Sequence, residues 1–129
     1  MSDLKSFFQM FYLLDYCYPQ CKKDDLGAFL SCISPELWTD GMPIDKAILS
    51  DWKKKFGNIK LSKHNLKKIT IDFLVQYEED FGFSFYQVKE YLPTCDEEVI
   101  ELAIERGERH IKELGKTEDH LEKNDLEIF

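Results

Sequence analysis

The chain has 129 residues, of which 43% are hydrophobic and 14% aromatic, and its net charge is −8. This length predicts one domain with a core of its own, and the apolar content excludes a disordered acidic chain. The acidic balance argues against non-specific nucleic-acid binding, which needs clustered cations. Six glycines and four prolines are too few for an all-β domain with many tight turns.

The N-terminal residues and the apolar runs predict a cytoplasmic protein without a membrane partner. Residues 1–5 lack the basic region of a secretory signal, and no apolar run approaches the roughly 18 residues that a membrane span needs. In this compartment we expect free thiols at Cys17, Cys21, Cys32 and Cys95. The three histidines have no paired spacing, so we expect no metal site and no cofactor.

Apolar spacings of three and four residues predict helices along most of the chain. The predicted helices cover residues 3–18, 24–33 or 25–33, 45–56, 62–80 or 65–80, 84–92 and 94–114. Pro19 ends the first helix, Gly57 the third and Gly115 the sixth. Two capping boxes, Ser84-x-x-Gln87 and Thr94-x-x-Glu97, are expected to open the fifth and sixth helices.

These elements predict an all-α helical bundle of about six to eight helices. Residues 73–92 echo residues 12–30, which suggests two related helical hairpins. The fourth helix is apolar on much of its circumference and is expected to be central. Residues 1–115 would form a single helical domain, and residues 116–129 an acidic tail or short docking helix. The side chains expected in the core are Phe11, Leu14, Leu30, Trp52, Phe73, Leu74 and Ile104, with Trp38 folded back onto them.

Candidate catalytic groups are sparse in this sequence. It contains no nucleophile motif, no phosphate-binding loop and no helical metal-ligand pair, so we expect no enzymatic activity. Arg106 and His110 are four apart on the sixth helix, and such a pair supports RNA cleavage in some small helical ribonucleases. Glu105, Glu108 and Glu113 surround them and would repel phosphate. A solvated helix face is therefore the favoured interpretation, and a small helical ribonuclease is an alternative.

The acidic residues are unevenly distributed. Residues 1–60 contain eight basic and eight acidic residues, whereas residues 61–129 contain nine basic and seventeen acidic ones. The negative electrostatic field of the second half suits a basic partner, although the same charge also favours solubility. The candidate partner-binding residues are Glu78, Glu79, Asp80, Glu97, Glu101, Glu105 and Glu108. An apolar centre could come from Phe81, Phe83 and Phe85, or these rings could bury between the fourth and fifth helices.

Residues 24–52 contain the most specific pattern in the chain. They read Asp24-Asp25-Leu26-Gly27, then Asp40-Gly41-x-Pro43-x-Asp45-x-Ala47, then Asp51-Trp52. The pattern resembles small acidic helical immunity proteins from bacterial polymorphic-toxin and contact-dependent growth inhibition systems. The resemblance implies a protein that binds a cognate toxin domain, often a nuclease with a cationic cleft, and occludes it stoichiometrically. The matching residues are expected to cap helices, form a turn and pack in the core. They therefore identify the scaffold and do not locate the inhibitory surface. A helical adaptor or regulator of another basic protein is the alternative.

Overall fold

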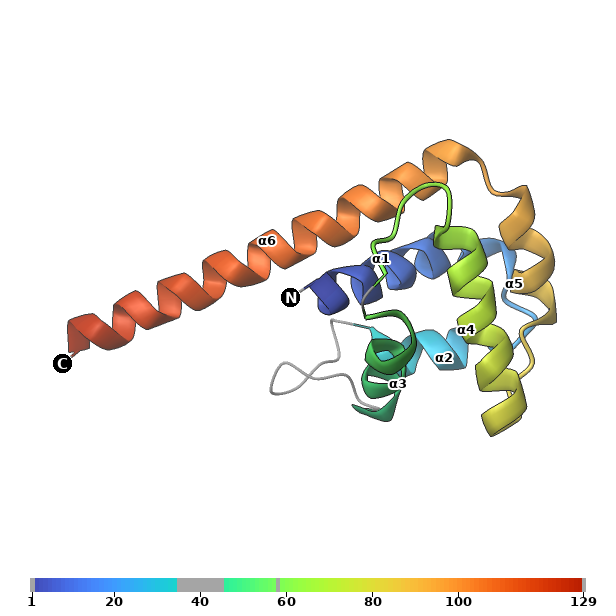
Figure 1. The fold of residues 1–129 in the computed structure, drawn as a ribbon, viewed down its shortest axis with the longest axis horizontal. Coiled ribbons are helices and arrows are strands. Elements are labelled where there is room, and N and C mark those ends of the chain that lie inside the picture. The colour runs from blue at the N-terminus through green and yellow to red at the C-terminus, as the bar shows by residue number, and fades with distance from the viewer. Residues whose placement is uncertain (1, 35–45, 58, 129) are drawn as a thin grey trace.

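The computed structural model describes the backbone of residues 2–34, 46–57 and 59–128, and the side chains of residues 4–34, 47–57 and 59–113. Over these residues the fold is all helical, with six α-helices and no strand, which confirms the predicted fold class. The α-helices are α1 (Ser2–Cys17), α2 (Leu26–Ile33), α3 (Lys46–Phe56), α4 (Leu66–Phe81), α5 (Tyr86–Tyr91) and α6 (Glu97–Ile128) (Figure 1). Two short 3-10 helices, η1 (Tyr18–Gln20) and η3 (Leu92–Thr94), follow α1 and α5. None of the described helices combines the length and apolarity that a membrane span requires.

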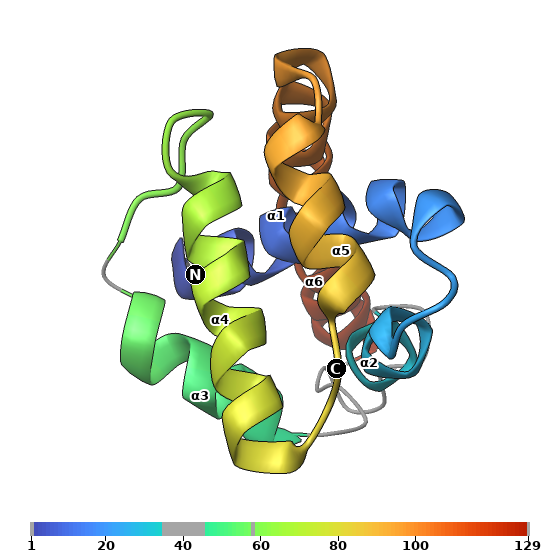
Figure 2. The same ribbon diagram turned by 90° about the vertical axis from the view of Figure 1, so that its right-hand side faces the viewer.

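Helix α1 is the centre of the bundle. It lies against α6 and also contacts α2, α3 and α5 (Figures 1 and 2). Every residue from Ser6 to Leu14 except Tyr12 is buried, so most of the circumference of this helix is covered over these residues. The expectation that the fourth helix is central is wrong. Helix α4 buries one stripe, while Lys68 and Asp72 on its other side are exposed.

Aromatic side chains from α2, α3 and α4 form the core beneath α1. The ring of Phe73 lies 5.1 Å from that of Trp52, and further rings from α2, α3 and α4 surround it. Trp52 Nε1 donates a hydrogen bond to Ser6 Oγ at 2.8 Å, which joins α3 to α1. Six of the seven predicted core residues are buried, namely Phe11, Leu14, Leu30, Trp52, Phe73 and Leu74. Ile104 is only partly buried, because Ala103 and Gly107 occupy the inner line of α6.

Helices α1 and α6 approach each other closely at Gly107. A Cβ atom built at this position would lie 2.5 Å from Gln9 Cγ and 2.8 Å from the Gln9 backbone nitrogen. The Gln9 amide donates to the carbonyl of Ile104 at 3.3 Å, one turn earlier on α6. The missing side chain therefore lets the two backbones pack directly against each other.

Neither predicted capping box forms. Gln87 Oε1 accepts the backbone N–H of Lys23 at 2.9 Å, so it does not return to Ser84. Thr94 Oγ1 donates to the carbonyl of Tyr91 at 2.7 Å within η3. The Asp96 carbonyl then accepts the first hydrogen bonds of α6. Both capping boxes have the correct sequence spacing, but Gln87 and Thr94 form hydrogen bonds with other backbone groups.

Helix α6 continues through Gly115 to Ile128, and its C-terminal part extends beyond the other helices (Figure 1). The predicted stop at Gly115 is wrong, since one glycine in a helix costs only about 1 kcal/mol relative to alanine and does not by itself end it. The division into a domain over residues 1–115 and a tail over residues 116–129 stays a prediction. Trp38 and the predicted turn over residues 40–45 lie outside the described residues.

The turn before α2 is hydrogen-bonded to the turn before α5. The Asp24 carboxylate accepts the N–H groups of Leu26 and Val88, both at 2.9 Å, so one side chain serves the first turns of both helices. Asp25 and Ser84 exchange two further bonds, from Asp25 N to the Ser84 carbonyl at 2.9 Å and from Ser84 N to the Asp25 carboxylate at 2.7 Å. The predicted capping role of this acidic pair is therefore confirmed at Asp24, and it extends to the first turns of two helices.

Candidate functional site

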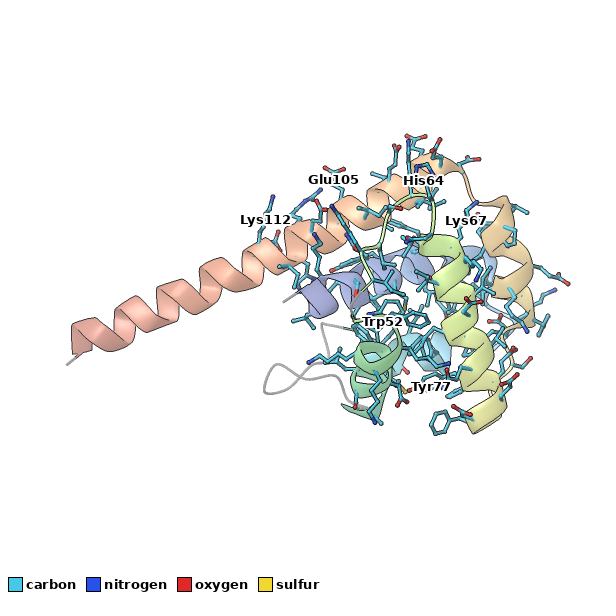
Figure 3. The ribbon with its side chains drawn as sticks, viewed as in Figure 1. Trp52, His64, Lys67, Tyr77, Glu105 and Lys112 are labelled. Carbon is cyan, nitrogen blue, oxygen red and sulfur yellow. The ribbon has the colours of Figure 1, made fainter. Side chains whose placement is uncertain are left out.

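The predicted partner-binding residues fall into two groups at opposite ends of the molecule. The first, the α4 acidic end, consists of Glu78, Glu79 and Asp80. The second, the α6 acidic face, consists of Glu97, Glu101, Glu105 and Glu108. In both ribbon views the end of α4 lies at the bottom and the start of α6 at the top, and Glu105 lies on the upper side with α6 (Figures 1–3). The structure therefore does not bring the seven acids together into one surface.

Each carboxylate of the α6 acidic face lies near a cation of the same chain. The ion pairs are Lys63–Glu97 (3.2 Å), Lys63–Glu101 (3.8 Å), Arg109–Glu105 (3.8 Å) and Lys5–Glu108 (3.7 Å). The hydrogen bond that Lys63 donates to Glu97 and the charges of both glutamates raise the pKa of Lys63. All these side chains are substantially exposed, so each pair contributes little to stability. Their effect is to reduce the net negative charge of this face.

Glu78 is a structural residue of the α4–α5 connection. Its Oε2 accepts the backbone N–H of Phe85 at 2.7 Å, and its Oε1 lies 2.5 Å from Lys89 Nζ. Burial works to raise the pKa of the Glu78 carboxyl, but the hydrogen bonds from Lys89 and Phe85 and the charge of Lys89 together lower it. The side chain is only 18% exposed. Glu78 therefore ties the end of α4 to the start of α5 and is not available to a partner.

Glu79 and Asp80 present a different surface, beside an exposed aromatic ring. Both carboxylates are exposed, and Phe81, which follows them, is 59% exposed with its ring 4.8 Å from that of Tyr77. Asp80 accepts a hydrogen bond from the Gln76 amide at 3.2 Å. Within the described side chains, neither carboxylate lies at ion-pair distance from a cation. Of the three predicted phenylalanines, Phe81 alone is exposed, whereas Phe83 is partly buried and Phe85 fully buried.

Arg106 and His110 lie in a pocket between α1 and α6, with a volume of about 440 Å³. The pocket is lined by Phe11, Tyr12, Asp15, Tyr16, Ser34, Arg106 and His110. The Tyr12 hydroxyl lies 2.6 Å from His110 Nδ1, and the His110 ring stacks on Phe8 with centroids 4.3 Å apart. The Arg106 guanidinium lies 4.9 Å from the centroid of the Tyr12 ring.

These contacts change the interpretation of the Arg106 and His110 pair. Burial first, and then the charge of Arg106, lower the pKa of His110 below its ordinary value of 6.5, although Glu113 acts in the opposite direction. A neutral histidine beside an arginine can in principle accept a proton near a bound phosphate. Both side chains also hold α6 against α1 and are partly buried, so the expectation of a solvated helix face is wrong. The residue that sequence reasoning missed is Tyr12, 98 positions away from His110.

His110 is expected to make the stability of the protein depend on pH. Its folded-state pKa is lowered, so the unfolded chain binds the proton more tightly. The stabilising contribution is therefore present above about pH 6.5 and is lost as the pH falls toward the folded-state pKa. We expect the free energy of unfolding, measured by urea denaturation, to decrease from about pH 7.5 to 5.5. The decrease should be smaller in His110→Gln and unchanged in His64→Gln, and equal slopes in both variants would contradict this assignment.

Comparison of the chain with family models, with curated proteins and with solved structures gave no significant match.

Three parts of the pattern in residues 24–52 lie within the described structure. Asp24 caps, Trp52 is fully buried, and Gly27 packs closely, since a Cβ there would lie 3.0 Å from the Tyr18 ring. In the described side chains, no three His, Cys, Asp or Glu residues are arranged to hold a metal ion.

Proposed function

We propose that the protein is an immunity protein, which binds a cognate basic toxin domain in the cytoplasm and occludes its active or substrate-binding site. The observation that carries the proposal is the charge asymmetry, with all of the net charge of −8 in residues 61–129. The pattern in residues 24–52 supports the same function. If the toxin is a nuclease, its cationic cleft would receive carboxylates in place of phosphates, and the opposed fields would accelerate association.

We favour Glu79 and Asp80 of the α4 acidic end over the α6 acidic face as the contact surface. Glu79 and Asp80 have no competing cation among the described side chains, whereas each acid of the α6 face does. Carboxylates at a helix C-terminus oppose the macrodipole, and a bound cationic group would relieve that repulsion. Tight interfaces also need an apolar or aromatic centre, and Phe81 offers one beside the two acids.

The test is the affinity for the toxin domain encoded by the neighbouring gene, measured by biolayer interferometry at low and high salt. Glu79→Lys with Asp80→Lys is expected to reduce the association rate on the order of tenfold at low salt, and less at high salt. Phe81→Ala should mainly accelerate dissociation. The matched control is Glu90→Lys with Glu98→Lys, which makes the same charge change at exposed positions elsewhere.

A triple variant of the α6 acidic face, Glu97→Lys with Glu101→Lys and Glu105→Lys, completes the comparison. It is expected to have a smaller effect than the variant of the α4 acidic end. If the described acidic variants all retain wild-type affinity and salt dependence, the contact surface lies elsewhere. If the protein binds a different basic protein and not the toxin, it is an adaptor or regulator.

One observation favours a ribonuclease as the second candidate, namely the pocket that contains Arg106 and His110. Incubation of the purified protein with RNA, with and without divalent metal, separates the two functions. We expect no cleavage. Cleavage that disappears in His110→Ala would contradict the immunity proposal.

A further inference from the structure

Three buried cysteines gather where the end of α1 approaches the start of α6. Cys17 is the last residue of α1, and its Sγ lies 3.5 Å from Sγ of Cys95, which follows η3. Cys21 is also buried and lies near enough to interact electrostatically with both. A disulfide bond is about 2.05 Å long, so the Cys17 and Cys95 sulfurs need to approach by about 1.5 Å. Cys95 lies in the short connection between η3 and α6, where a small adjustment does not break a helix.

Lys67 places a positive charge beside this pair of thiols. Its Nζ donates to the carbonyl oxygen of Cys95 at 2.7 Å and to that of Pro93 at 3.3 Å, from the first turn of α4 (Figure 3). Burial, followed by the neighbouring thiols, strongly raises the pKa of Cys17, while the charge of Lys67 acts to lower it. Cys17 is fully buried and Cys95 is 7% exposed, so Cys95 is the more accessible residue of the pair.

We propose that Cys17 and Cys95 are a site of oxidative modification, at which hydrogen peroxide produces a disulfide between α1 and the connection to α6. The Cys95 thiol releases its proton, the thiolate attacks one peroxide oxygen, the O–O bond breaks, and the departing hydroxide takes up the released proton to become water. Cys95 is now a sulfenic acid. The sulfur of Cys17 then attacks the Cys95 sulfur, the S–O bond breaks, and the oxygen leaves as water with the proton of Cys17. Two thiols and one peroxide give one disulfide and two waters.

This disulfide would close a long loop, because the two cysteines are 78 residues apart. It would connect the end of α1 to the start of α6, the two helices with the most extensive mutual contact in the fold. A cross-link of this kind restricts the unfolded chain, so the oxidised protein should melt at a higher temperature than the reduced protein.

The experiment treats the reduced, folded, full-length protein briefly with hydrogen peroxide and measures the intact mass without reduction. We expect a loss of about 2 Da, the removal of two thiol hydrogens. Trypsin should then release a cross-linked pair of peptides, residues 6–22 and residues 90–106. The first peptide contains both Cys17 and Cys21, so the digestion is repeated with Cys21→Ser. We expect the cross-link in Cys21→Ser and Cys32→Ser, and a melting temperature that rises on oxidation and returns with dithiothreitol.

The variants Cys17→Ser and Cys95→Ser should lose this cross-link, and Lys67→Met should form it more slowly. Far-UV circular dichroism verifies the fold of each variant, and Cys17→Ala and Cys95→Ala replace any serine variant that does not fold. Persistence of the cross-link in Cys17→Ser or Cys17→Ala would assign the bond to Cys21 and overturn the proposal. A gain of about 32 Da on the tryptic peptide of residues 90–106, without a cross-link, would overturn it as well, because Cys95 would then have become a sulfinic acid.

Discussion

Replacement of Phe73 by alanine is expected to lower the free energy of unfolding by about 3–5 kcal/mol. Phe73 is 1% exposed, and its ring lies between Phe29 of α2, Trp52 of α3 and Tyr77 of α4. The neighbouring rings contact one another, and Trp52 is also hydrogen-bonded to α1, so they are poorly placed to collapse into the cavity. Urea denaturation followed by circular dichroism measures the loss.

Phe81→Ala is the matched control, because it removes the same side chain from the same helix at a position that is 59% exposed. Its effect on stability should be within about 0.5 kcal/mol. Similar losses for the two variants would contradict the described packing of α4, in which one face is buried and the C-terminal end is open to solvent.

Gly107→Ala is expected to destabilise the protein by about 1–3 kcal/mol or more, through overpacking at the contact between α1 and α6. Alanine is the better helix former by about 1 kcal/mol, so intrinsic propensity alone predicts the opposite sign. The added Cβ would meet Gln9 backbone atoms at 2.8 and 2.9 Å, and backbone cannot turn aside as a flexible side chain can. The melting temperature of Gly107→Ala, measured by thermal unfolding, shows whether the substitution stabilises or destabilises the protein.

Gly27→Ala provides the graded comparison for this experiment. A Cβ at Gly27 would meet only the ring and hydroxyl of Tyr18, at 3.0 Å, and that side chain is able to shift. The loss of stability caused by Gly27→Ala should therefore be smaller than the loss caused by Gly107→Ala. A stabilised Gly107→Ala variant would show that α1 and α6 do not approach backbone to backbone.

Local signals in the sequence predicted the helices well, because apolar periodicity, proline and loop residues act over a few positions. These local signals were insufficient wherever a residue distant in the sequence determined the hydrogen bonds or the burial of a side chain. Ser84 and Gln87 have the spacing of a capping box, yet Asp25 and Lys23 take their hydrogen bonds. The apolar stripe of α4 looked wide enough for a central helix, but the central helix is α1, in which buried residues occur at consecutive positions.

The sequence predicted which type of residue would form the candidate site, namely acidic side chains, but not which of them share an exposed surface. Charge counting identified the acidic half of the chain, but it could not show that Glu78 is bonded to Phe85 and Lys89 while Glu79 is exposed. Adjacent residues on a helix point in different directions, and only the hydrogen bonds that Phe85 and Lys89 donate to Glu78 distinguish their roles. In the same way, no local pattern connects Cys17 with Cys95, whose proximity depends on the contact between α1 and α6.

The bridge at Asp24 has a consequence for local opening of the fold. Because one carboxylate accepts N–H groups from both Leu26 and Val88, the first turn of α2 and the first turn of α5 cannot fray independently. Segments that open together exchange their amide hydrogens together and behave as a single cooperative unit. The starts of α2 and α5, though far apart in sequence, should therefore share one exchange free energy at this junction, and removal of the Asp24 side chain should release both helix ends at once.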